Sequence, residues 1–161
     1  MAQLQTSLNS KTLGEANSLR ENRVLRYAAF FFTAGLLIHS ADHWRRGFDV
    51  LTPEVYWAGM ALSILGVTTI VLVLVRHRLA PLVAVAVGFP TALGVAASHL
   101  LPHWSLFSDA FPGSGVDALS YTAVLVETIS ALVLGAAGTY VLRHAGRRRA
   151  ARGLRGSRLN P

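Results

Sequence analysis

Four long apolar segments dominate this chain and restrict it to a membrane-spanning helical fold. They cover residues 24–44, 53–75, 79–101 and 117–142. Each is long enough to cross a bilayer core, which takes about 20 apolar residues. Inside a bilayer the backbone N–H and C=O groups must find partners within their own segment, so spans of this kind fold as helices. We therefore predict an all-α integral membrane protein in which four transmembrane helices form a small bundle.

The composition agrees with a membrane chain, because 52% of its residues are hydrophobic and only 14% are charged. A soluble domain usually has about 25% charged residues. The chain has no cysteine, which excludes disulfides, thiolate metal sites and a cysteine nucleophile. The sequence thus predicts a polar cytoplasmic N-terminal arm over residues 1–23, a transmembrane domain over 24–142 and a basic cytoplasmic tail over 143–161.

The distribution of basic residues predicts the orientation in the membrane. Of the 15 Lys and Arg residues, 13 lie before the first span or in its first turn, between the second and third spans, or after the fourth; only Arg45 and Arg46 lie elsewhere. The positive-inside rule then places both termini of this multi-pass protein on the cytoplasmic side of the cell membrane. The basic tail is typical of a topology anchor that also contacts anionic lipid head groups. Loosely spaced charge without a folded reading element does not indicate nucleic-acid binding.

The sequence partly repeats at an offset of 60 residues. Residues 39–74 and 99–134 share ten identities in 36 positions, and the scarce residue types among them are His39, His43, Trp44 and Asp49, matched by His99, His103, Trp104 and Asp109. Both copies run the same way through the membrane, which predicts two parallel-repeat helical hairpins related by a pseudo-twofold axis along the membrane normal. Such an axis would bring the two histidine pairs together on the outer side. The alternative is that two helix ends converged on similar interfacial residues.

Four of the six histidines form two pairs spaced i, i+4, which places both rings of a pair on one helix face. Two imidazoles at this spacing can share one metal ion. Asp42 lies on nearly the same face as His39 and could be a further ligand, or an acceptor that fixes the tautomer of an imidazole. Glu127 lies in the middle of the fourth span, where a lone carboxylate is costly and marks a candidate functional site.

These residues predict a transition-metal site near the outer face. The candidate ligands are His39, Asp42, His43, His99, His103 and Glu127. Imidazole-rich ligation suits Zn, Cu or Fe. If the site is catalytic, Glu127 is the candidate general base, which would activate a metal-bound water. The simpler alternative is that the histidines cap helix ends and bind water.

Two other functions stay open on the sequence alone. The first is a b-type haem electron carrier, with His39 and His99 as axial ligands and with Arg45 and Arg46 paired to the haem propionates. The second is a non-catalytic structural or assembly subunit of a membrane complex. Its small-residue faces would then pack against a membrane-protein partner or a second copy of the chain.

Overall fold

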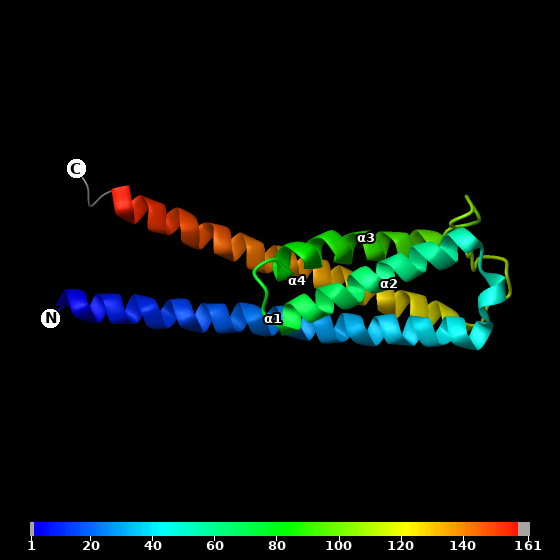
Figure 1. Ribbon diagram of the computed structural model, residues 1–161, viewed down its shortest axis with the longest axis horizontal. Coiled ribbons are helices and arrows are strands. Elements are labelled where there is room, and N and C mark those ends of the chain that lie inside the picture. The colour runs from blue at the N-terminus through cyan, green and yellow to red at the C-terminus, as the bar shows by residue number, and fades with distance from the viewer. Residues whose placement is uncertain (1, 158–161) are drawn as a thin grey trace.

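In the computed structural model the chain folds into four long helices and one short 3-10 helix (Figure 1). The long helices are α1 (Ala2–Arg46), α2 (Pro53–Leu74), α3 (Ala80–Leu100) and α4 (Ala118–Ser157), and the 3-10 helix is η1 (Phe48–Val50). The structure describes the backbone of residues 2–157 and the side chains of residues 19–148 and 150. Between residues 2 and 157 there is no strand, which confirms the prediction of an all-helical fold.

The helices lie side by side in an elongated bundle (Figure 1). The stretches long and apolar enough to cross a membrane are Leu19–Arg46, Pro53–Leu74, Ala80–Leu100 and Ala118–Arg148. This confirms the prediction of four such helices. The start of α1 and the end of α4 project from the same end of the bundle. The segments 47–52 and 101–117 close the opposite end, which we name the loop end.

Helices α1 and α4 both continue beyond their apolar spans. Helix α1 begins at Ala2, so the polar arm expected over residues 1–23 is helical from Ala2 onward, and α4 runs through the basic segment as far as Ser157. Arginines at 149, 152, 155 and 158 belong to the predicted lipid-binding tail, and their side chains lie outside the described part of the chain.

Local sequence signals explain where the helices at the loop end begin and end. Gly47 follows α1 with a φ of 86°, a backbone conformation that favours glycine. Thr52 caps α2, because its hydroxyl accepts a hydrogen bond from the Val55 N–H at 3.2 Å. The Asp117 carboxylate accepts a hydrogen bond from the Ser120 N–H at 3.1 Å and so caps the start of α4.

Helix α3 ends at Leu100, and this separates the second histidine pair. Leu101 is extended, with φ −84° and ψ 154°, as expected for a residue that precedes a proline. Pro102 has no N–H and cannot continue the helical hydrogen-bond ladder. His103 therefore lies beyond the helix, and the prediction that His99 and His103 share one helix face is wrong.

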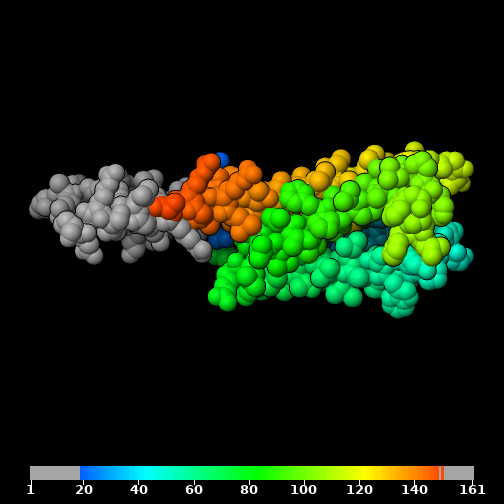
Figure 2. Space-filling view, turned by 90° about the horizontal axis from the view of Figure 1, so that it is seen from above, coloured from blue at the N-terminus to red at the C-terminus, as the bar shows by residue number. Residues whose placement is uncertain are grey.

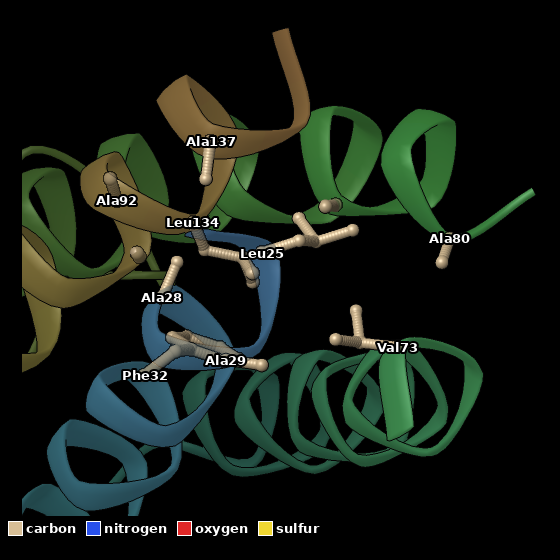
Figure 3. Packing of buried hydrophobic residues seen from close by; sticks show 11 residues of the cluster. Leu25, Ala28, Ala29, Phe32, Val73, Ala80, Ala92, Leu134 and Ala137 are labelled. Atoms are coloured by element: carbon tan, nitrogen blue, oxygen red, sulfur yellow. The ribbon is translucent and has the colours of Figure 1, made fainter. Parts of the chain in front are cut away.

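Helix α4 is the central element of the bundle. It packs extensively against α3 and α1, whereas α2 makes much smaller contacts with its neighbours. The views agree, with α3 and α4 lying side by side along the bundle (Figure 2). The buried core is made mainly of small side chains, several of which are labelled in Figure 3: Leu25, Ala28, Ala29, Phe32, Val73, Ala80, Ala84, Ala92, Ala131, Leu134 and Ala137.

Glycines allow α3 and α4 to pack with their backbones in contact. A Cβ atom added to Gly88 would lie 2.6 Å from the backbone N of Gly135 and 2.7 Å from the carbonyl O of Ala131. A Cβ atom added to Gly138 would lie 2.5 Å from the carbonyl O of Pro81. Small residues at helix interfaces permit this approach in membrane proteins. Gly135 and Gly138 of α4 therefore belong to a packing surface within the bundle.

The packing of the two hairpins is not symmetrical. Glu127 of α4 is 4% exposed, whereas its repeat counterpart Val67 of α2 is 53% exposed. A strict twofold axis would give α2 and α4 equal environments. The predicted repeat of two hairpins thus stays a prediction.

We expect Gly88→Ala to destabilise the bundle, because the new methyl group would force α3 away from α4. The free energy of unfolding should fall by about 1–3 kcal/mol, the usual cost of overpacking. Gly59→Ala is the matched control, since no atom lies within 4 Å of a Cβ built there. Thermal unfolding of both variants in detergent checks this, and equal melting temperatures would contradict the close packing.

Candidate metal centre

Three histidine rings meet at the loop end of the bundle. His39 and His43 lie in the last two turns of α1, and His99 lies in the last turn of α3. The ring centroids are 4.6 Å apart for His39 and His43, 4.9 Å for His39 and His99, and 5.6 Å for His43 and His99. One potential ligand atom from each ring lies within 4.8 Å of the other two. This group of three histidines could hold a metal ion, and we name it the histidine cluster.

The course of the chain explains why these rings meet. The i, i+4 spacing puts His39 and His43 on one face of α1. Helices α1 and α3 both run toward the loop end, so their last turns reach the same level (Figure 1). The approach of spans one and three near this end, expected from the repeat, is therefore present at the level of the side chains.

A carboxylate from α4 holds the first ring. Nδ1 of His39 donates a hydrogen bond to Oε2 of Glu127, and both side chains are more than nine-tenths buried. A proton on Nδ1 leaves the Nε2 atom of His39 with a free lone pair. This Nε2 atom is buried and makes no hydrogen bond to any described residue. A carboxylate behind an imidazole in this way orients the ring and raises its basicity as a metal ligand.

The loop between α3 and α4 holds the third ring in a similar way. Nδ1 of His99 lies 3.2 Å from the main-chain O of Asp109 and 3.3 Å from its carboxylate Oδ2. These contacts involve only Nδ1, so Nε2 of His99 stays available as a ligand atom. In His43 the buried Nδ1 atom has no hydrogen-bond partner among the described residues. Each of the three rings thus keeps a nitrogen that its neighbours do not use.

Backbone hydrogen bonds fix the loop against the end of α3. The N–H of Asp109 donates to the carbonyl of Ser98 at 3.0 Å, and the N–H of Phe111 donates to the carbonyl of His99 at 2.9 Å. These bonds satisfy carbonyls at the helix end that have no partner within α3. They also place the Asp109 side chain beside the histidine cluster.

Two arginines and three aspartates form a collar of ion pairs around the cluster. Arg45 contacts Asp42 at 2.7 Å and Asp117 at 2.8 Å. Arg46 forms an ion pair with Asp109 and lies 3.9 Å from Asp42. We name this set of five residues the ionic collar.

Two carboxylates of the collar have lowered pKa values. Burial opposes ionisation of Asp109, but its hydrogen bond with His99 and the charge of Arg46 outweigh burial, so the pKa of Asp109 lies below its usual value. The Ser120 N–H and the Arg45 guanidinium hold the pKa of Asp117 below its usual value. Both aspartates are therefore anions at neutral pH.

The structure brings most of the residues singled out from the sequence to the loop end, in different roles. His39, His43 and His99 form the cluster, and Glu127 contacts His39. Asp42 is buried but faces the two arginines, and Arg45 and Arg46 are engaged in the collar. His103 is exposed and lies outside the group of three.

Asp109, like Asp117 of the collar, is a residue at this site that the sequence-based candidate list omits. The sequence signal for Asp109 is its position ten residues after His99 in the second repeat copy, where it matches Asp49 of the first copy. The two aspartates differ in the structure, because Asp109 is partly buried against His99 and Asp49 is exposed. The fold of the loop therefore decides which of them reaches the cluster.

Comparison with known protein families, with curated proteins and with solved structures finds no match to this chain. Its class thus follows from the fold and the site. It is an all-helical protein with four helices able to span a membrane and with a histidine cluster that could bind a metal ion.

We expect Glu127→Ala to be much more damaging than Glu54→Ala. The Glu127 change leaves Nδ1 of His39 buried without an acceptor, which costs about 1–3 kcal/mol. Glu54 is a half-buried residue in the first turn of α2 and forms no ion pair with a described residue. Unfolding temperatures of the two variants in detergent measure the difference. Equal tolerance of the two changes would show that the Glu127 contact does not stabilise the fold.

Proposed function

We propose that this integral membrane protein binds one transition-metal ion through His39, His43 and His99. The observation that carries the proposal is the set of three imidazoles with unused ring nitrogens whose candidate ligand atoms lie within 4.8 Å of one another. In a tetrahedral zinc site with bonds of 2.0–2.1 Å, ligand nitrogens are about 3.4 Å apart. Small rotations of the rings would bring them to this spacing.

The donor set indicates the class of metal. Imidazole nitrogens suit Zn, Cu or Fe, whereas Mg and Ca prefer oxygen ligands. Three protein ligands leave the fourth position of a tetrahedral ion for water or another ligand, as in catalytic zinc sites. The proposed site is therefore suited to metal-dependent chemistry at that position.

The balance of charge also supports a dication. Asp42 and Glu127 are buried at this end of the bundle, and the Asp109 side chain is 13% exposed. Their negative charges are only partly balanced by Arg46, whose side chain is 11% exposed. Arg45 is 42% exposed and shares its charge with Asp117 in water. Uncompensated buried charge is strongly destabilising. A bound dication supplies the missing positive charge.

We assign Glu127 to holding the His39 ring. The sequence-based hypothesis makes it a general base, which would require its carboxylate to reach a metal-bound water. Its contact with Nδ1 of His39 instead favours a role as the acceptor behind a ligand. Asp109 has the same role behind His99.

The haem alternative is less well supported by the geometry. A haem with two axial histidines lies between their rings. Here the rings of His39 and His99 are in contact, and His43 packs against both. Arg45 and Arg46, expected to pair with propionates, are paired with aspartates. An absorption spectrum of protein expressed with adequate haem should lack a Soret band.

No particular observation favours the alternative of a structural or assembly subunit. The glycines that bring helices together at Gly88, Gly135 and Gly138 face each other's helices within the bundle. That role does not require a partner protein or a second copy of the chain. Exposed apolar side chains, such as Ile64 and Leu93, suit contact with lipid acyl chains.

We expect the purified protein to retain about one zinc ion per chain after removal of excess metal. His39→Ala and His99→Ala should each abolish this retention, because a two-imidazole site binds too weakly to hold the ion. His103→Ala is the matched control and should leave the stoichiometry unchanged, since His103 is exposed and outside the cluster. Elemental analysis measures the metal. A metal-free wild-type protein with an intact helical spectrum would overturn the proposal.

We also propose that both termini lie in the cytoplasm, which puts the histidine cluster on the outer side. The distribution of basic residues supports this orientation. The two arginines at the loop end, Arg45 and Arg46, are each paired with an aspartate, so they add no net positive charge to that end. Alkaline phosphatase fused after Pro161 should be inactive, whereas the same enzyme inserted at Gly113 in the loop should be active. The opposite pattern would place the cluster on the cytoplasmic side.

A further inference from the structure

The three rings of the histidine cluster differ in how far solvent reaches them. His39 and His99 are buried, whereas His43 is half-buried. A metal ion held by buried ligands needs a path by which it enters and leaves. Among the three rings, His43 is the one that such a path reaches first.

Buried groups close the cluster beside the other two rings. Glu127 of α4 is buried and contacts His39. Phe111 is also buried and packs on His99, with the two ring centroids 4.9 Å apart. The Phe111 N–H donates to the His99 carbonyl at 2.9 Å, so its backbone is fixed to the end of α3. Neither group can move aside without disrupting the packed part of the bundle.

The residue that covers His43 is a surface residue. The Phe48 ring stacks on the His43 ring, with the centroids 6.5 Å apart and the planes inclined by 23°. Phe48 is itself 38% exposed. Its ring makes edge contacts with Trp44 and Tyr56, at centroid distances of 5.2 and 6.0 Å. One exposed aromatic ring thus lies between His43 and the surroundings of the loop end.

The segment that carries Phe48 is weakly attached to the bundle. Phe48 is the first residue of η1, which has no buried residue and joins α1 to α2 at the loop end (Figure 1). Gly47 connects η1 to α1 with a φ of 86°. Segments with few buried contacts open locally at low cost in free energy, and a hinge needs few residues. The Phe48 ring can therefore leave His43 while α1 and α2 stay folded.

We propose, building on the metal site proposed above, that the metal ion enters and leaves the histidine cluster past His43, and that Phe48 is the gate of this path. A hydrated dication cannot pass an apolar ring at low cost, because the ring offers no ligand in place of water. The ion therefore waits until Phe48 moves aside. The gate sets how fast the cluster exchanges metal with the loop end, and it leaves the affinity to the three imidazoles.

The test measures metal exchange in the full-length protein in detergent, with Co²⁺ as the probe because its visible bands report a tetrahedral site. Stopped-flow mixing of metal-free protein with Co²⁺ gives the association rate constant. Mixing of the Co²⁺-loaded protein with excess EDTA gives the dissociation rate constant. Phe48→Ala should raise both by a similar factor of about ten or more, because removing the ring lowers one barrier that entry and exit share. The Kd should then stay unchanged.

Two matched variants show whether the effect belongs to the Phe48 ring. Val50→Ala removes an exposed apolar side chain from the same short helix and should leave both rate constants unchanged, since Val50 does not pack on His43. Phe48→Tyr keeps a stacked ring and should behave like the wild type. Equal acceleration by Val50→Ala and Phe48→Ala would show that loosening of η1 matters rather than the ring, and would overturn the assignment of the gate to Phe48.

The outcomes separate this inference from the metal proposal. If the wild type shows no Co²⁺ bands, the metal site itself is refuted, and the gate falls with it. If the bands appear and Phe48→Ala leaves both rate constants unchanged, only the gate is refuted. A rise in the dissociation rate constant alone would also refute it, because Phe48 would then support the ligands and not the path. If Phe48→Ala does not fold, Phe48→Leu takes its place, with a rise in both rate constants still required.

Discussion

The contact between Glu127 and His39 is the interaction on which the rest of the site depends. It joins α4 to α1 inside an apolar bundle, where neither group can exchange its partner for water. A buried carboxylate without a partner would be protonated or would destabilise the helix pair. The contact therefore fixes the register of the two helices. It also turns the unused nitrogen of His39 away from α4 and toward the other two rings.

The small residues of α3 and α4 determine whether the third ring can join. His99 belongs to α3, and α3 is positioned by the backbone contact of Gly88 with Gly135. A pair of helices separated by larger side chains would hold their last turns further apart. Packing in the apolar part of the bundle thus controls the geometry of a polar site at its end.

The ionic collar also helps to position the histidine rings. Asp109 contacts His99 on one side and Arg46 on the other, so the loop, α3 and α1 meet at a single carboxylate. Its neighbours hold its pKa below the usual value despite burial, and it stays charged at neutral pH. The result is a cluster of imidazole donors surrounded by charged side chains with an excess of carboxylates, an arrangement suited to a bound cation.

Much of this site could be read from the sequence, because helical spacing within one segment is a local property. The apolar segments predicted four spanning helices, and the i, i+4 spacing placed His39 and His43 on one face. Glu127 stood out because a lone carboxylate within a span is costly. The sequence could not separate His99 from His103, since their equal spacing suggested a second pair. Pro102 ends the helix between them, and only the structure shows that His103 is left exposed.

The sequence by itself determined four helices long and apolar enough to span a membrane, the first histidine pair and an acid within the fourth apolar segment. The tertiary structure decided which residues surround them. Asp109 rather than Asp49 contacts the histidine cluster, and Asp42 pairs with the two arginines instead of joining the candidate metal ligands. The physical reason is the range of the interactions. Helix formation in an apolar medium depends on neighbours along the chain, whereas the partners of a buried charge depend on which helices pack together and how a loop folds back.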